Sequence, residues 1–148
     1  MNFSFAPIKD LLKFQVMDIA RDAVSVPDSI WQKPPSAELR PDQTDEESLL
    51  PYAILDPVVQ SYVEDYVSTL PDMVDWSARM NEEDLKITSD RNALDSWLAG
   101  ESAAEDHDRV IRLIGRMEFK RRQTCPGVKV SRVAFGIGRR IPIVEKWS

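Results

Sequence analysis

Three cations follow one another in the stretch MEFKRRQTCPGVKVSR, which begins at Met117. Lys120, Arg121 and Arg122 are residue types that bind phosphates and carboxylates, Arg through a bidentate fork and Lys as a point charge. The cluster therefore predicts an anion-binding site. A structural alternative stays open, because cations in the last turn of a helix also complement the helix dipole.

Charge is divided unevenly along the 148 residues, although the net charge is only −6. From residue 109 onwards there are eleven Lys/Arg and two Asp/Glu, against eight and twenty-three before it. Such a division suits either a basic surface for an anion or mutual pairing of the two parts. Nucleic acid is not expected as a partner, because only Phe119 and Phe135 are interleaved with the basic residues.

Several catalytic signatures are missing from the sequence. It has no phosphate-binding G-x-x-x-x-G-K-[ST] loop and no G-x-G-x-x-G turn. With a single histidine and a single cysteine, neither a zinc site nor a Cys–His pair is expected. We expect His107 to be a solvated surface residue and Cys125 a half-buried thiol. The acidic pairs at 46–47 and 82–83 are expected to be solvated, so no metal ligand and no catalytic residue is assigned.

The composition fits one domain, or one large part of a domain. No apolar run is long enough to span a bilayer, and MNFSFAPIKD lacks the apolar core of a secretory signal, so a cytoplasmic location is expected. We divide the single partial domain by residue pattern. The expected parts are a helix and turn at 1–31, an aperiodic loop at 32–50, helices at 51–101, a long helix at 102–123 and a basic tail at 124–148.

Helical periodicity dominates the pattern, which predicts a mainly α fold with long loops and at most short strands. One amphipathic helix is expected from Lys9 to Ala23. Another begins near Pro51, with a fresh cap and first turn at Asp56-Pro57. One or two short helices are expected around Trp76 and Trp97.

The last predicted helix is the strongest. Ser102-Ala-Ala-Glu105 reads as a capping box, and the helix should run to about Arg122. Its core stripe is expected to comprise Val110, Ile111, Ile114, Met117 and the aliphatic stem of Arg121. The later VKVSRVAF and IPIV are expected to be short strands or extended loops.

Three stretches together resemble one family. FAPIKDLLK, KPPSAELRPDQTDEESLLPYAILD and EFKRRQTCPGVKVSRVAFGIGRRIPI are similar, in this order, to the C-terminal part of bacterial NAD synthetases of the glutamine-dependent branch. The resemblance covers residues 3–67 and 109–144, whereas 70–105 is longer and more divergent. It implies a segment of an α/β adenine-nucleotide-hydrolase-like domain. That domain binds ATP with Mg²⁺, adenylates the carboxylate of deamido-NAD, and forms the amide with ammonia.

The resemblance also implies roles for individual residues. Lys13 and Ser36 match contacts to ATP, and Phe119 and Lys120 match contacts to deamido-NAD. The loop 32–50 matches a lid over the active site. Without the resemblance, Lys13 and Lys120 would be surface lysines on helices and Ser36 an ordinary loop serine.

The sequence departs from that family because it has no SGGxDS loop. We therefore expect a C-terminal segment that makes no NAD alone, binds no cofactor tightly, and exposes the stripe Leu12, Val16 and Ile19. The missing N-terminal half or a homo-oligomer would cover that stripe. The alternative is a non-catalytic helical interaction module derived from the family, with Trp76 and Trp97 as interface anchors.

Overall fold

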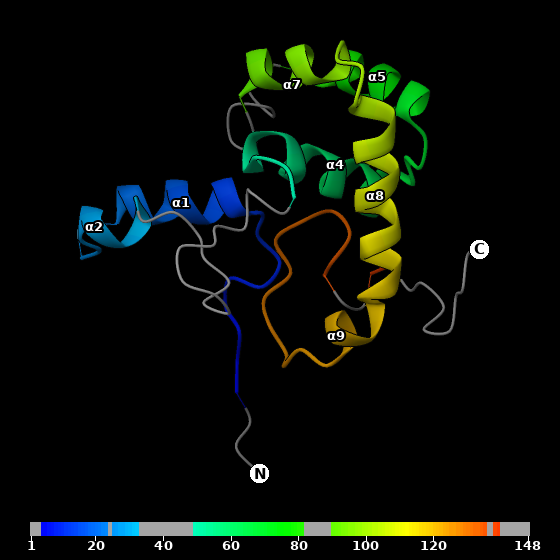
Figure 1. Ribbon diagram of the computed structural model, residues 1–148. Helices are drawn as coiled ribbons and strands as arrows, with labels where there is room; N and C mark the ends of the chain where they lie inside the picture. Colours follow the sequence, from blue (N-terminus) through cyan, green and yellow to red (C-terminus); the bar gives the residue numbers. More distant parts are fainter. Residues whose placement is uncertain (1–3, 24, 33–48, 82–89, 136–137, 140–148) are drawn as a thin grey trace, which may run out of the picture.

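The computed structural model describes residues 4–23, 25–32, 49–81, 90–135 and 138–139. This part of the chain contains helices and no strand, which confirms the prediction of a mainly α fold. The helices are α1 (Lys13–Asp22), α2 (Asp28–Trp31), α4 (Tyr52–Asp65), α5 (Leu70–Arg79), α7 (Arg91–Leu98), α8 (Ala103–Arg116) and α9 (Glu118–Arg122) (Figure 1).

The hydrophobic core lies around α4, which α5, α7 and α8 all contact. Its buried side chains come from all four helices, from Leu50, which precedes α4, and from Val67, which follows it. Trp76 on α5 and Trp97 on α7 belong to this core and are only 3% and 9% exposed. The short helices expected around these two residues are confirmed, and the burial of both rings argues against the alternative in which they are interface anchors. Their large rings are instead the main apolar filling between the helices.

Helix α4 runs without a break through Pro57, so the predicted fresh start at Asp56-Pro57 is wrong. Asp56 is not an N-cap in its own helix, because its carboxylate is turned towards α1. The helix ends at Tyr66, which has a left-handed φ of 61° and donates its N–H to the carbonyl of Ser61. A left-handed tyrosine is uncommon, and its ring stacks on the guanidinium of Arg139, 3.9 Å away.

The predicted capping box at Ser102 does not form. Ser102 has a helical backbone, with φ −83° and ψ −9°, whereas an N-cap residue needs an extended one to aim its side chain at the first turn. Its hydroxyl bonds the carboxylate of Asp106 instead, at 2.9 Å. The predicted single helix is also divided into α8 and α9 at Met117, which is 44% exposed and so lies outside the core.

His107 is fully buried, so the expectation of a solvated surface histidine is wrong. It shares the inward face of α8 with Ala103 and Val110, while the acids beside it in the sequence point outwards. Neither of its ring nitrogens has a hydrogen-bond partner in the described part of the chain. Burial lowers the pKa of this imidazole, and the charges of Asp108 and Asp72 oppose that effect only in part.

This burial predicts a loss of stability in acid. The folded-state pKa of His107 lies below its unfolded value, so the unfolded chain binds the proton more readily. The free energy of unfolding should therefore fall as the pH drops below about 6.5. A His107→Leu variant should lose less stability than the original between about pH 7 and 5, measured by urea denaturation. Equal pH dependence in the two proteins would contradict the prediction.

Candidate functional site

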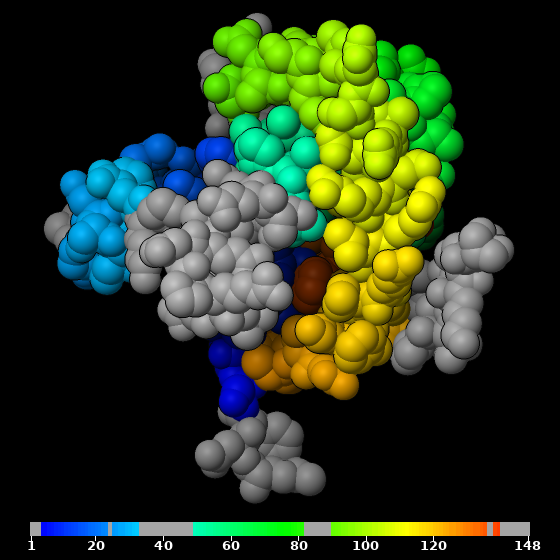
Figure 2. Space-filling model, in the orientation of Figure 1, coloured from blue at the N-terminus to red at the C-terminus, as the bar shows by residue number. Residues whose placement is uncertain are grey.

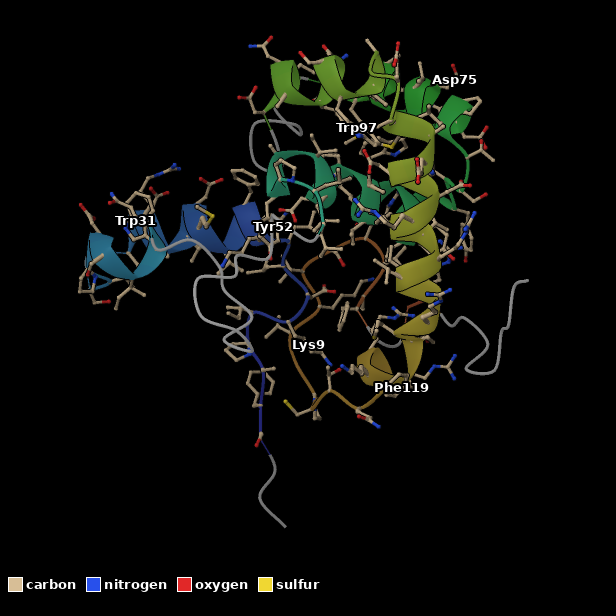
Figure 3. The ribbon with its side chains drawn as sticks, in the orientation of Figure 1. Lys9, Trp31, Tyr52, Asp75, Trp97 and Phe119 are labelled. Carbon is tan, nitrogen blue, oxygen red and sulfur yellow. The ribbon has the colours of Figure 1, made fainter. Side chains whose placement is uncertain are left out.

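Residues 4–12 lie against residues 124–135, which joins two of the stretches singled out in the sequence (Figures 1 and 3). The N–H of Ala6 donates to the carbonyl of Pro126 at 2.9 Å, and Lys9 Nζ donates to the carbonyl of Cys125 at 2.7 Å. These contacts use the residues that were expected to open a helix at Lys9. The helix therefore begins four residues later, at Lys13. Cys125 is half-buried, as predicted.

Gly127 makes this close approach possible. A Cβ atom at this position would lie 2.3 Å from the carbonyl oxygen of Ala6 and 2.9 Å from Cγ of Lys9. A contact with backbone at that distance cannot be relieved by a side-chain rotation. The glycine is therefore needed for packing at the join between the two segments.

Replacing Gly127 with alanine should destabilise the protein by about 1–3 kcal/mol. The matched control is Gly115→Ala on α8, where an added Cβ meets nothing within 4 Å. That control should stabilise by up to about 1 kcal/mol, because alanine is the better helix former. Urea denaturation midpoints of the three proteins would test this prediction. Similar values for both variants would show that the contact at Gly127 is unimportant.

Asp10 binds the second segment with both carboxylate oxygens. One oxygen accepts from the N–H groups of Val130 at 2.6 Å and Ser131 at 2.7 Å, and from the Ser131 hydroxyl at 2.9 Å. The other accepts from the N–H of Phe135. Burial raises the pKa of this carboxyl, but the bonds from Phe135, Val130 and Ser131 outweigh it and hold the pKa below its usual value. Asp10 thus fixes the 130–135 loop against the amino-terminal segment.

The basic cluster noted in the sequence is largely an internal network. Arg121 Nε lies 2.7 Å from a carboxylate oxygen of Glu118, and Arg122 Nε lies 2.6 Å from the other. Glu118 is fully buried and Arg121 is 8% exposed, with its guanidinium 5.5 Å from the ring centroid of Phe135. These two arginines therefore hold α9 together. The prediction that Arg121 contributes to the interior is confirmed, although through an ion pair.

Phe119 and Lys120 lie on the exposed side of the same helix. Phe119 is 42% exposed (Figure 3), and Lys120 is exposed beside it. Within the described residues, Lys120 makes no ion pair, unlike Arg121 and Arg122. Of the three clustered cations, Lys120 is thus the one best placed to meet an external anion.

Lys13 is the first residue of α1, and the start of this helix is held by α4. The N–H of Phe14 donates to Asp56 Oδ2 at 2.8 Å, and the N–H of Lys13 also bonds this carboxylate. Asp56 is only 4% exposed, and its burial raises its pKa to about 6 in spite of those bonds and the Lys13 charge. Ionising Asp56 in the folded protein therefore costs about 3 kcal/mol relative to the unfolded chain.

The carboxyl end of α4 is tied to the segment that follows residue 131. The guanidinium of Arg139 lies between the rings of Tyr62 and Tyr66, 4.0 and 3.9 Å from their centroids. Arg132 pairs with Asp65, which also accepts from Trp76 Nε1 at 2.8 Å. Helix α4 therefore links the core, the start of α1 and the later basic segment.

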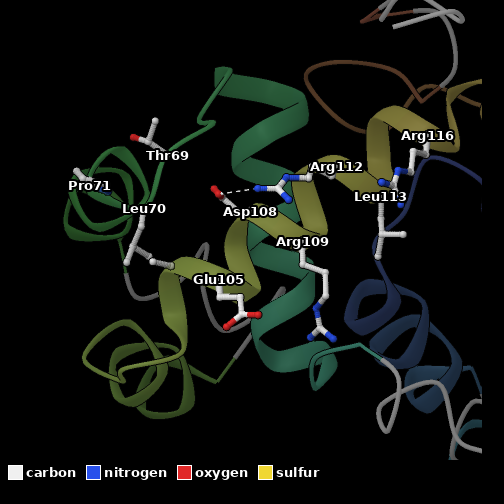
Figure 4. A pocket seen from close by; sticks show the side chains of 10 residues that line it. Thr69, Leu70, Pro71, Glu105, Asp108, Arg109, Arg112, Leu113 and Arg116 are labelled. Carbon is white, nitrogen blue, oxygen red and sulfur yellow. Dashed lines mark hydrogen bonds and ion pairs between the residues drawn. The ribbon is translucent and has the colours of Figure 1, made fainter. Parts of the chain in front are cut away.

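Two hollows accompany this arrangement. A cavity of about 110 Å³ lies between residues 9–12, α4 and the 130–135 loop, with Asp10, Gln60 and Phe135 among its walls. A larger groove of about 720 Å³ follows α8 and the start of α5, where Arg112 pairs with Asp108 (Figure 4). In the described ranges no three His, Cys, Asp or Glu side chains gather as a metal site would require.

The residues predicted for the site are only partly brought together. Lys13 lies on α1, which packs against α4, whereas Phe119 and Lys120 lie on α9, which packs against α8. The 124–135 segment after α9 is fixed to residues 6–10 before α1. Ser36, most of the predicted lid at 32–50, the acidic pairs at 46–47 and 82–83, and the IPIV stretch lie outside the described residues. The VKVSRVAF stretch is an extended loop.

Sequence reasoning missed Asp10, Asp56 and Glu118 as organising residues. A carboxylate in an apolar neighbourhood was the available signal for Asp56, within YAILDPVV. Nothing in the local pattern distinguishes Asp10 or Glu118 from surface acids. Among the described residues, every helix is too short or too polar to span a lipid bilayer.

Comparison with known proteins gives one family. The family model of NAD synthase matches residues 1–92. The glutamine-dependent NAD(+) synthetase of Xanthomonas campestris pv. campestris is 36% identical over 150 residues, covering 97% of this chain and 23% of the relative. Those of Aquifex aeolicus and Thermotoga maritima are 35% and 34% identical, each covering 99% of this chain and 22% of the relative. The chain thus spans less than a quarter of the length of these relatives. No solved structure matches it.

Proposed function

Because the chain belongs to the NAD synthase family, we propose that it forms the C-terminal segment of an α/β synthetase domain that converts deamido-NAD to NAD with ATP. The observation that carries this proposal is the joining of two family-like stretches, residues 4–12 and 124–135, through Lys9, Asp10 and Gly127. These contacts hold the segment after α9, which carries Phe119 and Lys120, against the segment before α1, which begins with Lys13.

Such a reaction needs exposed cations to stabilise negatively charged groups. A carboxylate becomes a useful electrophile only after adenylation, and the departing pyrophosphate must be stabilised by positive charge. We assign Lys13 and Ser36 to ATP, and Phe119 and Lys120 to deamido-NAD. Mg²⁺ would neutralise the phosphates, but the described residues offer no carboxylate cluster to hold it. Its protein ligands would have to come from elsewhere.

Several features support a partner for this chain. Helices α1 and α2 extend from the side of the body (Figures 1 and 2), and α1 buries none of its own residues. Ile19 and Ile30 are 54% and 64% exposed, and Phe5 is 60% exposed. We propose that the missing part of the synthetase domain, or a second copy of the chain, covers this face in the cytoplasm. The interaction module without catalysis is the weaker alternative, since Trp76 and Trp97 lie in the core.

A complementation assay tests the proposal. The purified chain would be mixed with the part of the Xanthomonas campestris relative that precedes the matched region, and ATP-dependent formation of NAD from deamido-NAD and ammonia would be measured. Activity should require both parts and should fall at least about tenfold with Lys120→Met. The control is Lys129→Met, an exposed lysine of the same basic segment. Activity of the chain alone, or none in the mixture, would contradict the proposal.

A further inference from the structure

Helix α1 fixes its own beginning only in part. Its N-cap position is Leu12, which has no side-chain acceptor, and its first turn contains no acidic residue. Gln15 accepts from the N–H of Leu12 at 2.9 Å, which leaves the N–H groups of the next three residues, 13 to 15, without a partner inside the helix. Since none of the helix's side chains is buried, packing alone does not fix this end either.

Asp56 supplies what α1 lacks. It reaches from α4, 42 positions along the sequence, and accepts from Phe14 at 2.8 Å and from the N–H of Lys13. Its negative charge also complements the positive end of the helix dipole. The first turn of α1 is therefore located by a side chain of the protein core.

A cap of this kind does not need a buried carboxylate. Ser, Thr or Asn can bond the first N–H groups of a helix without a buried charge. At Asp56 the desolvated charge opposes folding, and such costs gather at functional sites more often than elsewhere. Of the charged groups in the described elements packed on Asp56, the Lys13 ammonium is the one whose charge acts on it.

We propose that Asp56 is the positioning residue of the ATP site, because it fixes the backbone of Lys13 and provides a counter-charge for the Lys13 ammonium. This inference rests on the proposed function, in which Lys13 contacts ATP. The bonds to Lys13 and Phe14 fix the point from which the lysine side chain extends. The charge of Asp56 acts on the Lys13 ammonium without a salt bridge between the two, so the ammonium stays available to a phosphate.

A double-mutant cycle in the complemented enzyme tests the inference. ATP binding would be measured by calorimetry for the original, Asp56→Ala, Lys13→Met and the double variant. Asp56→Ala removes the acceptor of the Phe14 N–H, so it should weaken ATP binding about tenfold and change the KM for deamido-NAD less than about twofold. Because Asp56 acts through Lys13, adding Asp56→Ala to Lys13→Met should cause little further loss. Asp65→Ala is the matched control, an α4 aspartate that contacts Trp76 and Arg132 instead of α1.

The outcomes separate the two proposals. No ATP binding by the original mixture, or binding unaffected by Lys13→Met, would overturn the proposed function and this inference with it. Binding that Lys13→Met weakens but Asp56→Ala leaves unchanged would overturn the inference alone. So would additive losses in the double variant, which indicate a general structural role.

A measurement on the unsubstituted chain guards against a variant that fails to fold. Asp56 should titrate with a pKa of about 6, and the nuclear magnetic resonance signals of the Phe14 amide and the Lys13 side chain should follow that same titration. Lys13 signals that do not move while the Phe14 amide titrates would contradict the role of Asp56 as a counter-charge.

Discussion

Replacing Glu118 with alanine should destabilise the protein by about 3–5 kcal/mol, because it leaves a buried charge without its partner. Glu118 is fully buried and bonds Arg121 through two of that guanidinium's nitrogens, at 2.7 and 3.1 Å, and Arg122 at 2.6 Å. Arg121 would remain in an interior position, 8% exposed and against Phe135. A large fall in the urea midpoint, with loss of α9 structure, is the expected result.

Glu105→Ala is the control for this change. It removes the same charge from the exposed face of the neighbouring helix α8, so its effect should stay within about 0.5 kcal/mol. Glu118→Gln should fall between the two, because the amide keeps the volume and one acceptor but loses the charge. An equal, small effect of Glu118→Ala and Glu105→Ala would show that the network contributes little.

Replacing Asp10 with alanine should cost about 2–4 kcal/mol, since the N–H groups of Val130, Ser131 and Phe135 lose their acceptor together. The loss should be local as well as global. Amide hydrogen exchange at these three positions should accelerate more than exchange in α4. In the complemented enzyme, the variant should also lose activity, because the segment that follows Lys120 is no longer fixed.

The pH dependence of Asp10 has a defined sign. The pKa of this carboxyl is lowered in the folded protein. Its contribution to the free energy of unfolding is therefore present above the pKa of the unfolded chain, and it is lost as the pH falls through the pKa of the folded protein. Asp10→Ala should therefore lower the free energy of unfolding most near neutral pH and least in strong acid. Asp18→Ala, which removes a surface partner of Arg21 on α1, is the control and should have little effect at any pH. Unchanged exchange at Val130 in Asp10→Ala would contradict this account.

Elements that depend on local pattern could be predicted from the sequence. The short helices around Trp76 and Trp97 were predicted, and the helix that carries Val110 was predicted from its apolar stripe together with a capping box that does not form. Errors of detail arose where a distant residue changed a local preference. Lys9 lies outside the expected helix because its ammonium donates a hydrogen bond to the carbonyl of Cys125. Asp56 does not begin a helix because its carboxylate accepts a hydrogen bond from the N–H of Phe14.

Burial of charged residues was harder to predict. The sequence DHD suggests an exposed position. His107, its middle residue, is nevertheless buried, because it lies one helical turn after the buried Ala103 and so on the same face of α8. Likewise KRR reads as three free cations, although Glu118, one turn earlier, neutralises part of the cluster from the interior. The proposed roles of Lys13, Phe119 and Lys120 came from family resemblance. The structure adds that Lys13 is the first residue of α1 and that the other two lie in the short helix α9.

The contacts between residues 6–10 and 125–135 also determine the order in which the chain can fold. They join positions 116 to 125 apart in sequence, so closing them carries the entropy of a very long loop. The helices α4 to α8 contact one another over shorter separations and can assemble first. During synthesis, Lys9 and Asp10 must therefore wait until residues 125–135 have emerged before they find their partners.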